Sequence, residues 1–193
     1  MKTCVVSACV CLFALLSDSR VHAEEDPVVS QNGVLEISGS LQHAPCVLNM
    51  ASAYQTVELG NVARSHLQQA GDRAPPVTFQ LRFMDCRRIA GSLRNERTGT
   101  LVWSRYEPVL SVAFIAPADA DDPRLIKVQG VSGMGLRLTD PLGRDARLGQ
   151  GGEPLFLAHG SDTLTWHVQP TRTSAPLTNG PFRAVVDFRL TYD

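Results

Sequence analysis

The histidines that could bind a metal ion or act as a general base are spread singly along the chain. His43, His66, His159 and His167 form no H-x-x-x-H or H-x-H pair, the spacings that bring two imidazoles to one metal ion. The stretch "GVSGMG" at 130–135 superficially resembles a serine elbow or a phosphate loop, but it lies between two short strand-like stretches and opens no helix. The sequence therefore predicts no catalytic site, no metal site and no cofactor.

Carboxylates that could bind calcium are concentrated in "DADD" at 119–122. Pro123 follows directly, and the glycine and the final glutamate of a calcium-binding loop are missing from the sequence around it. We therefore expect a solvated turn at this position.

The first 23 residues have the pattern of a secretory signal peptide. Lys2 precedes the apolar run "VVSACVCLFALL", and the small-residue sequence "VHA" comes directly before "EEDP". We expect cleavage after Ala23. The run is too short to cross a membrane, and no later stretch reaches the roughly 18 apolar residues that a membrane span needs. The sequence thus predicts an exported protein without a stable membrane span.

Cys46 and Cys86 are the two cysteines that such a cleavage leaves in the chain. Export brings them into an oxidising compartment, where a pair of thiols is expected to form a disulfide. The alternative, a metal-binding or catalytic thiol, needs partners at ligand spacing, and none lies nearby. A bridge closing a loop of this length contributes roughly 4 kcal/mol on the chain-entropy account.

The charge of the exported chain gives no reason to expect nucleic acid or an anionic membrane surface as a partner. The signal removes Lys2, Arg20 and Asp18 from totals of 18 basic and 19 acidic residues, which leaves 16 and 18. The densest basic stretch, "CRRIAGSLRNER" at 86–97, lacks interleaved aromatic residues, and we expect a solvated loop there.

Hydrophobic periodicity identifies the elements that would position these residues. Every strong signal after residue 23 has period two, which is typical of strands with one buried face. Clusters of Gly, Pro and Asp separate the strands, and one helix-friendly stretch lies at 62–71. Many short strands between turns predict a single all-β sandwich. The predicted strands span residues 34–42, 78–86, 110–116, 125–130, 135–140, 163–170 and 182–192.

The two tryptophans, Trp103 and Trp166, could stack on a sugar ring. In a β-sandwich such side chains more often belong to the core, which is the interpretation favoured here. A secreted carbohydrate- or receptor-binding sandwich that acts alone stays an alternative function.

The last predicted strand runs essentially to the end of the chain, where no later segment could pair with it. Polar side chains occupy most of its second face, so the first face is expected to be buried. From periodicity alone this is an ordinary core strand. The apolar face comprises Phe182, Ala184, Val186, Phe188, Leu190 and Tyr192.

A comparable alternating face lies early in the exported chain. Each Leu or Ile on it would contribute roughly 1.5 to 3 kcal/mol if buried. Gly39 interrupts the face, and a glycine within a strand often marks the close approach of another backbone. From the residues alone, this segment could also be the domain's own first strand. The face comprises Gly33, Leu35, Ile37, Gly39 and Leu41.

Five motifs, in this order along the chain, resemble the pilin subunits assembled by the chaperone/usher pathway, of which type 1 and P pili are familiar cases. The resemblance covers the whole chain after the signal. The motifs are "GVLEISGSLQHAPC" at 33–46, "YQTVELGNV" at 54–62 as a short strand, "VTFQLRFMDC" at 77–86, "GMGLRLTDPLGRDARLG" at 133–149, and a chain end with Gly180 fourteenth from the end and Tyr192 penultimate.

The resemblance implies an incomplete immunoglobulin-like sandwich that lacks its final strand. Residues 24–42 would be an N-terminal donor-strand extension and residues 43–193 the pilin domain. The C-terminal strand would border an open groove, in which a periplasmic chaperone first lends a strand and the next subunit's extension then replaces it. The implied groove edge comprises Gly180, Phe182, Ala184, Val186, Phe188, Leu190, Tyr192 and Asp193, the last through its carboxylate, held by basic chaperone residues.

The function implied by the resemblance is that of a non-enzymatic structural subunit, major or minor, of a surface fimbria that supports cell adhesion. Its partners would be the chaperone, an outer-membrane usher and neighbouring subunits, met on export through the periplasm. The polar stretch at 91–108 is longer than the family leads us to expect. It keeps open an alternative in which this subunit terminates and anchors the fibre.

Overall fold

The structure, a computed structural model, describes residue 36 and residues 44–192, and residues 44–192 form the domain discussed below. Its larger sheet has five antiparallel strands in the order β1 (Val47–Leu48), β2 (Val77–Cys86), β9 (Gly160–Arg172), β7 (Met134–Thr139) and β6 (Ile126–Lys127). The second sheet has the order β10 (Asp187–Tyr192), β5 (Val109–Ile115) and β8 (Leu155–Phe156). Strands β3 (Gly91–Arg94) and β4 (Leu101–Ser104) form a separate hairpin, and the helical elements are α1 (Met50–Ala53) and the 3₁₀ turn η1 (Arg64–His66).

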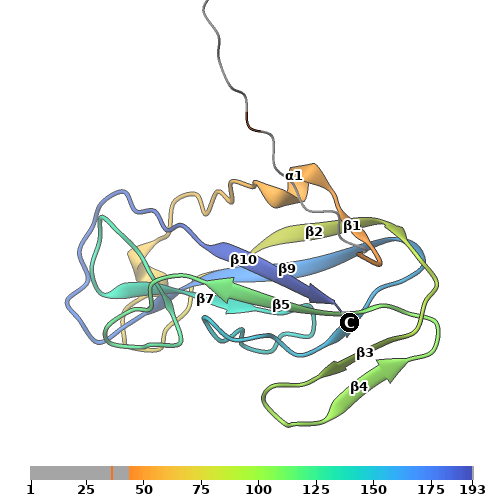
Figure 1. The fold of residues 1–193 in the computed structure, drawn as a ribbon. Helices are drawn as coiled ribbons and strands as arrows, with labels where there is room; N and C mark the ends of the chain where they lie inside the picture. The colour runs from red at the N-terminus through yellow and green to blue at the C-terminus, as the bar shows by residue number, and fades with distance from the viewer. Residues whose placement is uncertain (1–35, 37–43, 193) are drawn as a thin grey trace, which may run out of the picture. The chain divides into compact units, whose positions relative to one another are not determined.

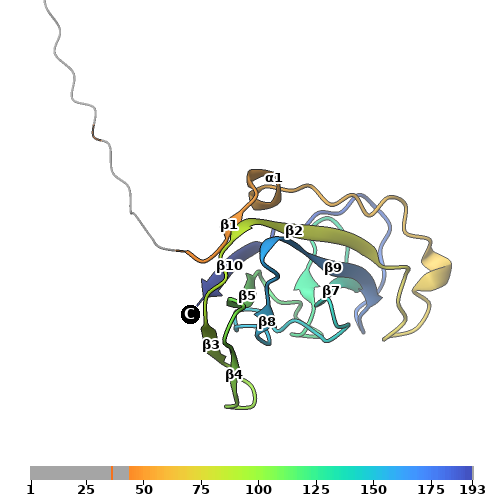
Figure 2. The same cartoon turned by 90° about the vertical axis from the view of Figure 1, so that its right-hand side faces the viewer.

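The two larger sheets pack face to face, as the perpendicular views in Figures 1 and 2 show. Alternate side chains of the long strands point into the space between them, which is why their sequences have period two. On β9 the inward residues Leu164, Trp166 and Val168 are buried, and on β2 Leu81 and Phe83 are almost completely covered. The predicted β-sandwich is therefore confirmed, and Trp166 belongs to its core, as expected.

The hairpin of β3 and β4 corrects the expectation of a solvated loop at 86–97. Gly91 pairs with Ser104 and Arg94 with Leu101, so half of the hairpin lies within the stretch that was expected to be a loop. Its turn is closed by the Asn95 side chain, whose Oδ1 accepts a hydrogen bond from the Arg97 backbone N–H at 2.9 Å. Gly99 supplies the positive φ, 74°, that the turn requires.

Two further expectations concern short segments. The turn at 119–122 is confirmed, because the Asp119 carboxylate accepts backbone N–H groups of Asp121 and Asp122 at 2.9 and 3.3 Å. Trp103 was expected in the core, and this is wrong: on β4 it is 64 % exposed, since none of the other described strands packs on that face of the two-stranded hairpin.

The sandwich has two distinct ends. The end that carries Cys86, the β3–β4 hairpin and Tyr192 is called the hairpin end, because β2 ends there, β5 begins there and Tyr192 pairs with Leu110. The other is called the Gly180 end and comprises the loop 116–125, the turn 128–133 and the segment 173–181. Asp121 ties the loop 116–125 to the segment 173–181 by accepting hydrogen bonds from the Thr173 hydroxyl and the Ala175 N–H. In Figure 1 these ends lie at the right and left of the domain.

Candidate functional site

A disulfide joins Cys46 and Cys86, with the two Cα atoms 4.1 Å apart and both side chains 2 % exposed. The predicted bridge is thus present. It anchors the first strand, where Val47 pairs with Met84, to the end of β2. The chain continues from Cys46 directly into β1, so the bridge fixes the position at which this strand begins.

A groove with a volume of about 1050 Å³ runs between two backbone segments on the surface of the sandwich. One wall is formed by residues 55–62 and the other by residues 180–186. Its floor consists of apolar side chains that belong to both sheets, and all but the half-buried Phe79 are buried, between 1 and 7 % exposed. They are Phe79, Phe114, Ile126, Leu136, Leu138 and Val168.

The first wall, residues 55–62, was expected to be a short strand, and this is wrong for the described part of the chain. The segment is extended but pairs with no strand among the described residues. Val57, Leu59 and Val62 are half-buried against the core, so the segment is held by side chains and not by a ladder. Sequence reasoning missed its role in the groove, although the alternation of Val57 and Leu59 is a weak signal of it.

The second wall continues into β10, and its side chains alternate along the whole segment. All of the predicted apolar face, Phe182, Ala184, Val186, Phe188, Leu190 and Tyr192, is half-buried, while Arg183, Val185, Asp187 and Arg189 are exposed. The strand itself is shorter than predicted, since it begins at Asp187. Before that point only Arg183 is bridged, to Gln129, with N···O distances of 3.1 and 2.9 Å.

Strand β10 lies at the edge of its sheet. It pairs with β5 from Asp187 opposite Ile115 to Tyr192 opposite Leu110, and its other side has no neighbour among the described strands. Half of the backbone N–H and C=O groups of such an edge point outward, where they can pair with another strand. The groove therefore combines an apolar floor with an available backbone edge.

Two glycines allow the second wall to lie where it does. A Cβ on Gly133 would lie 2.6 Å from the Ala175 carbonyl oxygen, and one on Gly130 would collide with the carbonyl oxygen of Pro181. Both glycines also have positive φ, 76° and 101°. The chain that follows β9 can therefore pack directly on the β6–β7 turn, where Thr178 donates its N–H to Ser132 at 3.2 Å.

Tyr192 lies at the end of β10, at the hairpin end of the sandwich. Its hydroxyl is buried and has no hydrogen-bond partner among the described residues. Burial disfavours the charged phenolate and raises the pKa of Tyr192 to about 12. The hydroxyl thus stays protonated at neutral pH and is free to donate a hydrogen bond to an added partner.

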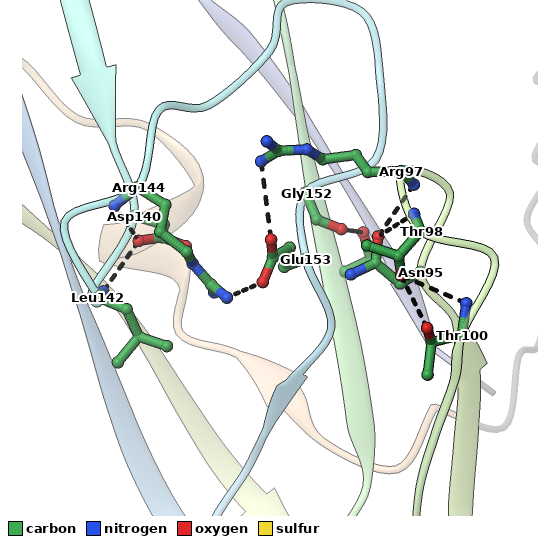
Figure 3. A network of polar contacts seen from close by, with 10 residues as sticks. Asn95, Arg97, Thr98, Thr100, Asp140, Leu142, Arg144, Gly152 and Glu153 are labelled. Atoms are coloured by element: carbon green, nitrogen blue, oxygen red, sulfur yellow. Dashed lines mark hydrogen bonds and ion pairs between the residues drawn. The ribbon is translucent and has the colours of Figure 1, made fainter.

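In the motif at 133–149, the aspartate stabilises a turn. Asp140 accepts backbone N–H groups of Leu142 and Arg144 at 2.9 and 2.8 Å through Oδ1, and its Oδ2 accepts from Arg144 Nε at 2.6 Å. Arg144 continues to Glu153, and Glu153 reaches Arg97 at 3.7 Å (Figure 3). This chain of four charges connects the turn after β7 with the β3–β4 hairpin.

The predicted donor face, Gly33, Leu35, Ile37, Gly39 and Leu41, and the terminal Asp193 lie outside the described residues. Their roles, and that of the groove edge, stay predictions. Within residues 44–192 no three His, Cys, Asp or Glu side chains gather in a way that could hold a metal ion. The helices described there are too short or too polar to cross a membrane.

Comparison with known proteins identifies the class of protein to which this arrangement belongs. The family described as fimbrial protein matches residues 35–193. The chain is 30 % identical to the fimbria A protein of Serratia marcescens over 164 residues, 83 % of this chain and 84 % of that protein. It is 26 % identical to long polar fimbria protein A of Salmonella typhimurium, over 94 % of this chain and 96 % of that protein.

Solved structures agree on the fold. The P pilus rod subunit PapA aligns with a TM-score of 0.62 at 23 % identity, over 78 % of this chain and the whole of that subunit. A subunit from the structure of a chaperone–usher pilus gives a TM-score of 0.62 at 22 % identity, over 87 % of this chain and all of the other. The sandwich is therefore the immunoglobulin-like fold of pilin subunits.

The chain belongs to the fimbrial protein family. It is a fimbrial subunit of the chaperone–usher type, and its partners include neighbouring pilus subunits. Because the family consists of structural subunits, the expectation of a non-enzymatic protein is confirmed.

Proposed function

We propose that this subunit is polymerised by donor-strand exchange, with its own groove as the acceptor and residues 24–42 as the donor for a neighbour. The observation that carries the proposal is the open groove of about 1050 Å³ between residues 55–62 and 180–186. An extended strand laid in this groove would cover the half-buried apolar side chains of its walls and pair with an unoccupied backbone edge at the same time. Addition of a strand to an exposed sheet edge is a known mode of peptide recognition.

The empty groove is unfavourable for a free subunit. Phe79 and Phe114 line its floor, with their ring centroids 6.2 Å apart, and six further core or wall side chains on the β10 side remain half-buried instead of buried. A groove with half-buried apolar walls beside an unpaired strand edge favours aggregation. This is the physical reason for a chaperone, which on this proposal occupies the groove in the periplasm before another subunit does.

The donor segment has the chemistry that the floor requires. Leu35, Ile37 and Leu41 would point into the groove on one face of an extended chain, since alternate side chains share a face. Gly39 on the same face would allow the strand to approach a shallow part of the groove. Asp193 would meet basic residues of the chaperone through its terminal carboxylate.

The proposal also includes the route by which the subunit is exported and reaches the fibre. Residues 1–23 would be removed as a signal peptide, residues 24–42 would form the extension and 43–193 the pilin domain. An outer-membrane usher would then pass the subunit to a fibre on the cell surface that supports adhesion. The open groove favours a subunit within the fibre over one that terminates it, because a terminator needs a groove that refuses a strand.

Periplasmic expression without a chaperone tests this proposal. The unmodified chain is expected to aggregate or be degraded, whereas a chain with residues 24–42 fused after Asp193 through a short flexible linker should accumulate as a soluble monomer. The fusion places the added strand antiparallel to β10, because the chain ends at the hairpin end. A matched fusion with Ile37→Asp should fail to rescue. Soluble, cooperatively melting unmodified chain would contradict the proposal and favour a sandwich that acts alone.

A further inference from the structure

A small apolar patch lies on the outer face of the β3–β4 hairpin. Leu101, Trp103 and Tyr106 are 53, 64 and 60 % exposed, and Leu101 and Trp103 share one face of β4. Arg94 pairs with Leu101 across the hairpin and so stands beside the patch. Trp, Tyr and Arg are the residues most enriched at the centres of protein interfaces. These three side chains, Leu101, Trp103 and Tyr106, are called the hairpin patch below.

The hairpin that carries the patch is fixed to the rest of the domain at its tip and at its base. At the tip of the hairpin, Glu96 accepts the Gly151 N–H at 3.0 Å, and Arg97 joins the charged chain through Glu153 (Figure 3). At its base, Gly91 approaches β5 so closely that a Cβ would lie 2.6 Å from the Val109 nitrogen. Fixed at both ends, the hairpin presents its patch with little ordering cost on binding.

The hairpin patch stays accessible when a strand fills the groove. The groove lies on the β10 side of β5, while the hairpin rests on segment 148–156, which covers the other side of β5. Gly149 donates to the Phe114 carbonyl at 2.7 Å and Gly152 to that of Val112 at 3.0 Å along this other side. An occupied groove therefore does not cover the patch.

The direction of the chain decides which surface the patch would meet in a fibre. All ladders between the described strands are antiparallel, so an antiparallel donor is the one that continues the sheet. Such a donor runs from the acceptor's hairpin end towards its Gly180 end. The described domain of the donor begins at Ala44, and the Cys46–Cys86 bridge holds this beginning at the donor's own hairpin end. The donor's hairpin end thus faces the acceptor's Gly180 end.

The hairpin and the loop 116–125 carry opposite net charges. The stretch 87–107 around the hairpin contains five arginines against two glutamates. The loop 116–125 at the Gly180 end contains three aspartates against one arginine, and Asp119, Asp121 and Asp122 are held in a fixed turn. Arg73, Arg137 and Arg172 line a cavity together with Asp121 and Asp122, and Arg124 is paired with Asp122 at 2.8 Å. The opposite charge therefore concerns the loop's own residues and not the whole end of the domain.

We propose that the hairpin patch docks on the loop 116–125 of the neighbouring copy of this chain that accepts its donor strand. The inference rests on the proposed strand exchange. The three side chains of the patch are too few for a stable interface of their own, which needs about 800 Å² per partner. Next to a donated strand they form a second contact, which fixes the angle between consecutive subunits and stiffens the fibre.

Photo-cross-linking in assembled fibres tests the docking. Fibres carrying Trp103→p-benzoylphenylalanine should give cross-links to residues 116–125 of a neighbouring copy, located by mass spectrometry. The matched control places the same group at Leu142, which is 69 % exposed in the turn after β7 and should give none to that loop. Fibres of the Trp103→Ala, Tyr106→Ala variant should form but lose stiffness, measured as a shorter persistence length.

The outcomes separate this inference from the proposed function. A peptide of residues 24–42 should bind the double variant as tightly as it binds the unmodified subunit, because the groove is untouched. Fibres that form normally and yet cross-link from position 103 elsewhere, or not at all, overturn the docking and leave strand exchange standing. If the peptide does not bind the unmodified subunit, both the strand exchange and the docking are overturned.

Discussion

The Phe114 ring stands edge-on to the indole of Trp166, with the ring centroids 4.7 Å apart and the planes at 70°. Phe114 belongs to β5 and Trp166 to β9, so the contact joins the two sheets. On its other sides Phe114 approaches Phe188 of β10 at 6.4 Å and lines the floor of the groove. One side chain therefore belongs both to the core and to the proposed acceptor site.

Replacing Phe114 with alanine should lower the free energy of unfolding by about 3 to 5 kcal/mol, since it removes a buried aromatic ring and leaves a cavity. Urea unfolding of the subunit with its groove filled by the fused donor strand would measure the change. Phe156→Ala on β8 is the matched control, because that ring is 44 % exposed and should cost far less. Equal losses for the two variants would mean that Phe114 is not a core residue.

Removing the disulfide should weaken the domain by roughly 4 kcal/mol on the chain-entropy account, given the sequence separation of 40 from Cys46 to Cys86. The Cys46→Ser, Cys86→Ser double variant, unfolded in urea in the same fused form, gives this number. A single Cys46→Ser variant controls for the free thiol that it leaves. An unchanged midpoint in the double variant would show that the bridge contributes nothing to stability.

The sequence was sufficient to predict the strands with two well-differentiated faces. In β2 from Val77 to Phe83 and in β9 from Leu164 to Val168 every second residue is a large apolar one, and the pattern specifies both the strand and its buried side. It was not sufficient for residues 55–62, because the hydrogen-bond partner that would complete a strand there is not part of the described chain. It also failed for Trp103, since an aromatic side chain carries no sign of whether a second layer covers it.

The groove could be predicted only in part for a similar reason. Phe182, Ala184 and Val186 alternate correctly, but their backbone is unpaired and so differs from the strand that alternation alone suggests. The floor residues are ordinary core positions in sequence, and only the separation of the two walls in space makes them the floor of a groove. Gly130 and Gly133 set that separation through contacts with residues about 45 positions later, which no local pattern reveals.

Tyr192 should make the stability of the domain depend on alkaline pH. Its folded pKa, about 12, lies above the value of 10 for a free tyrosine, so the unfolded chain loses its proton first. The stabilisation from the neutral hydroxyl is complete below pH 10 and is lost as the pH rises from there to about 12. Urea unfolding at several pH values would show this loss.

The matched variants for that titration are Tyr192→Phe and Tyr54→Phe. Tyr192→Phe cannot ionise and should lose less stability over this pH range. Tyr54 is 87 % exposed, and its replacement should leave the dependence of the unmodified protein in place. An identical alkaline loss in the Tyr192→Phe variant would assign the effect to other groups.

Replacing Gly39 with tryptophan should block donation of the extension without affecting the domain. A bulky side chain on the groove-facing side would hold the donor strand away from the floor, whereas Ser38→Trp on the opposite face should be tolerated. Incorporation of each variant into fibres, measured against its folded yield in complex with chaperone, separates the two effects. Normal incorporation of Gly39→Trp would refute its place in the groove.

The central claim, that the groove accepts the N-terminal extension of another copy, is tested most directly by adding a synthetic peptide of residues 24–42 to the refolded subunit. At a concentration 100 times the dissociation constant, a ligand specific to the folded state adds about 2.7 kcal/mol, which corresponds to roughly 5 to 10 °C in melting temperature for a domain of this size. The account predicts such a rise with the natural peptide and none with an Ile37→Asp peptide. An unchanged melting temperature with the natural peptide, at concentrations up to its solubility limit, would contradict it.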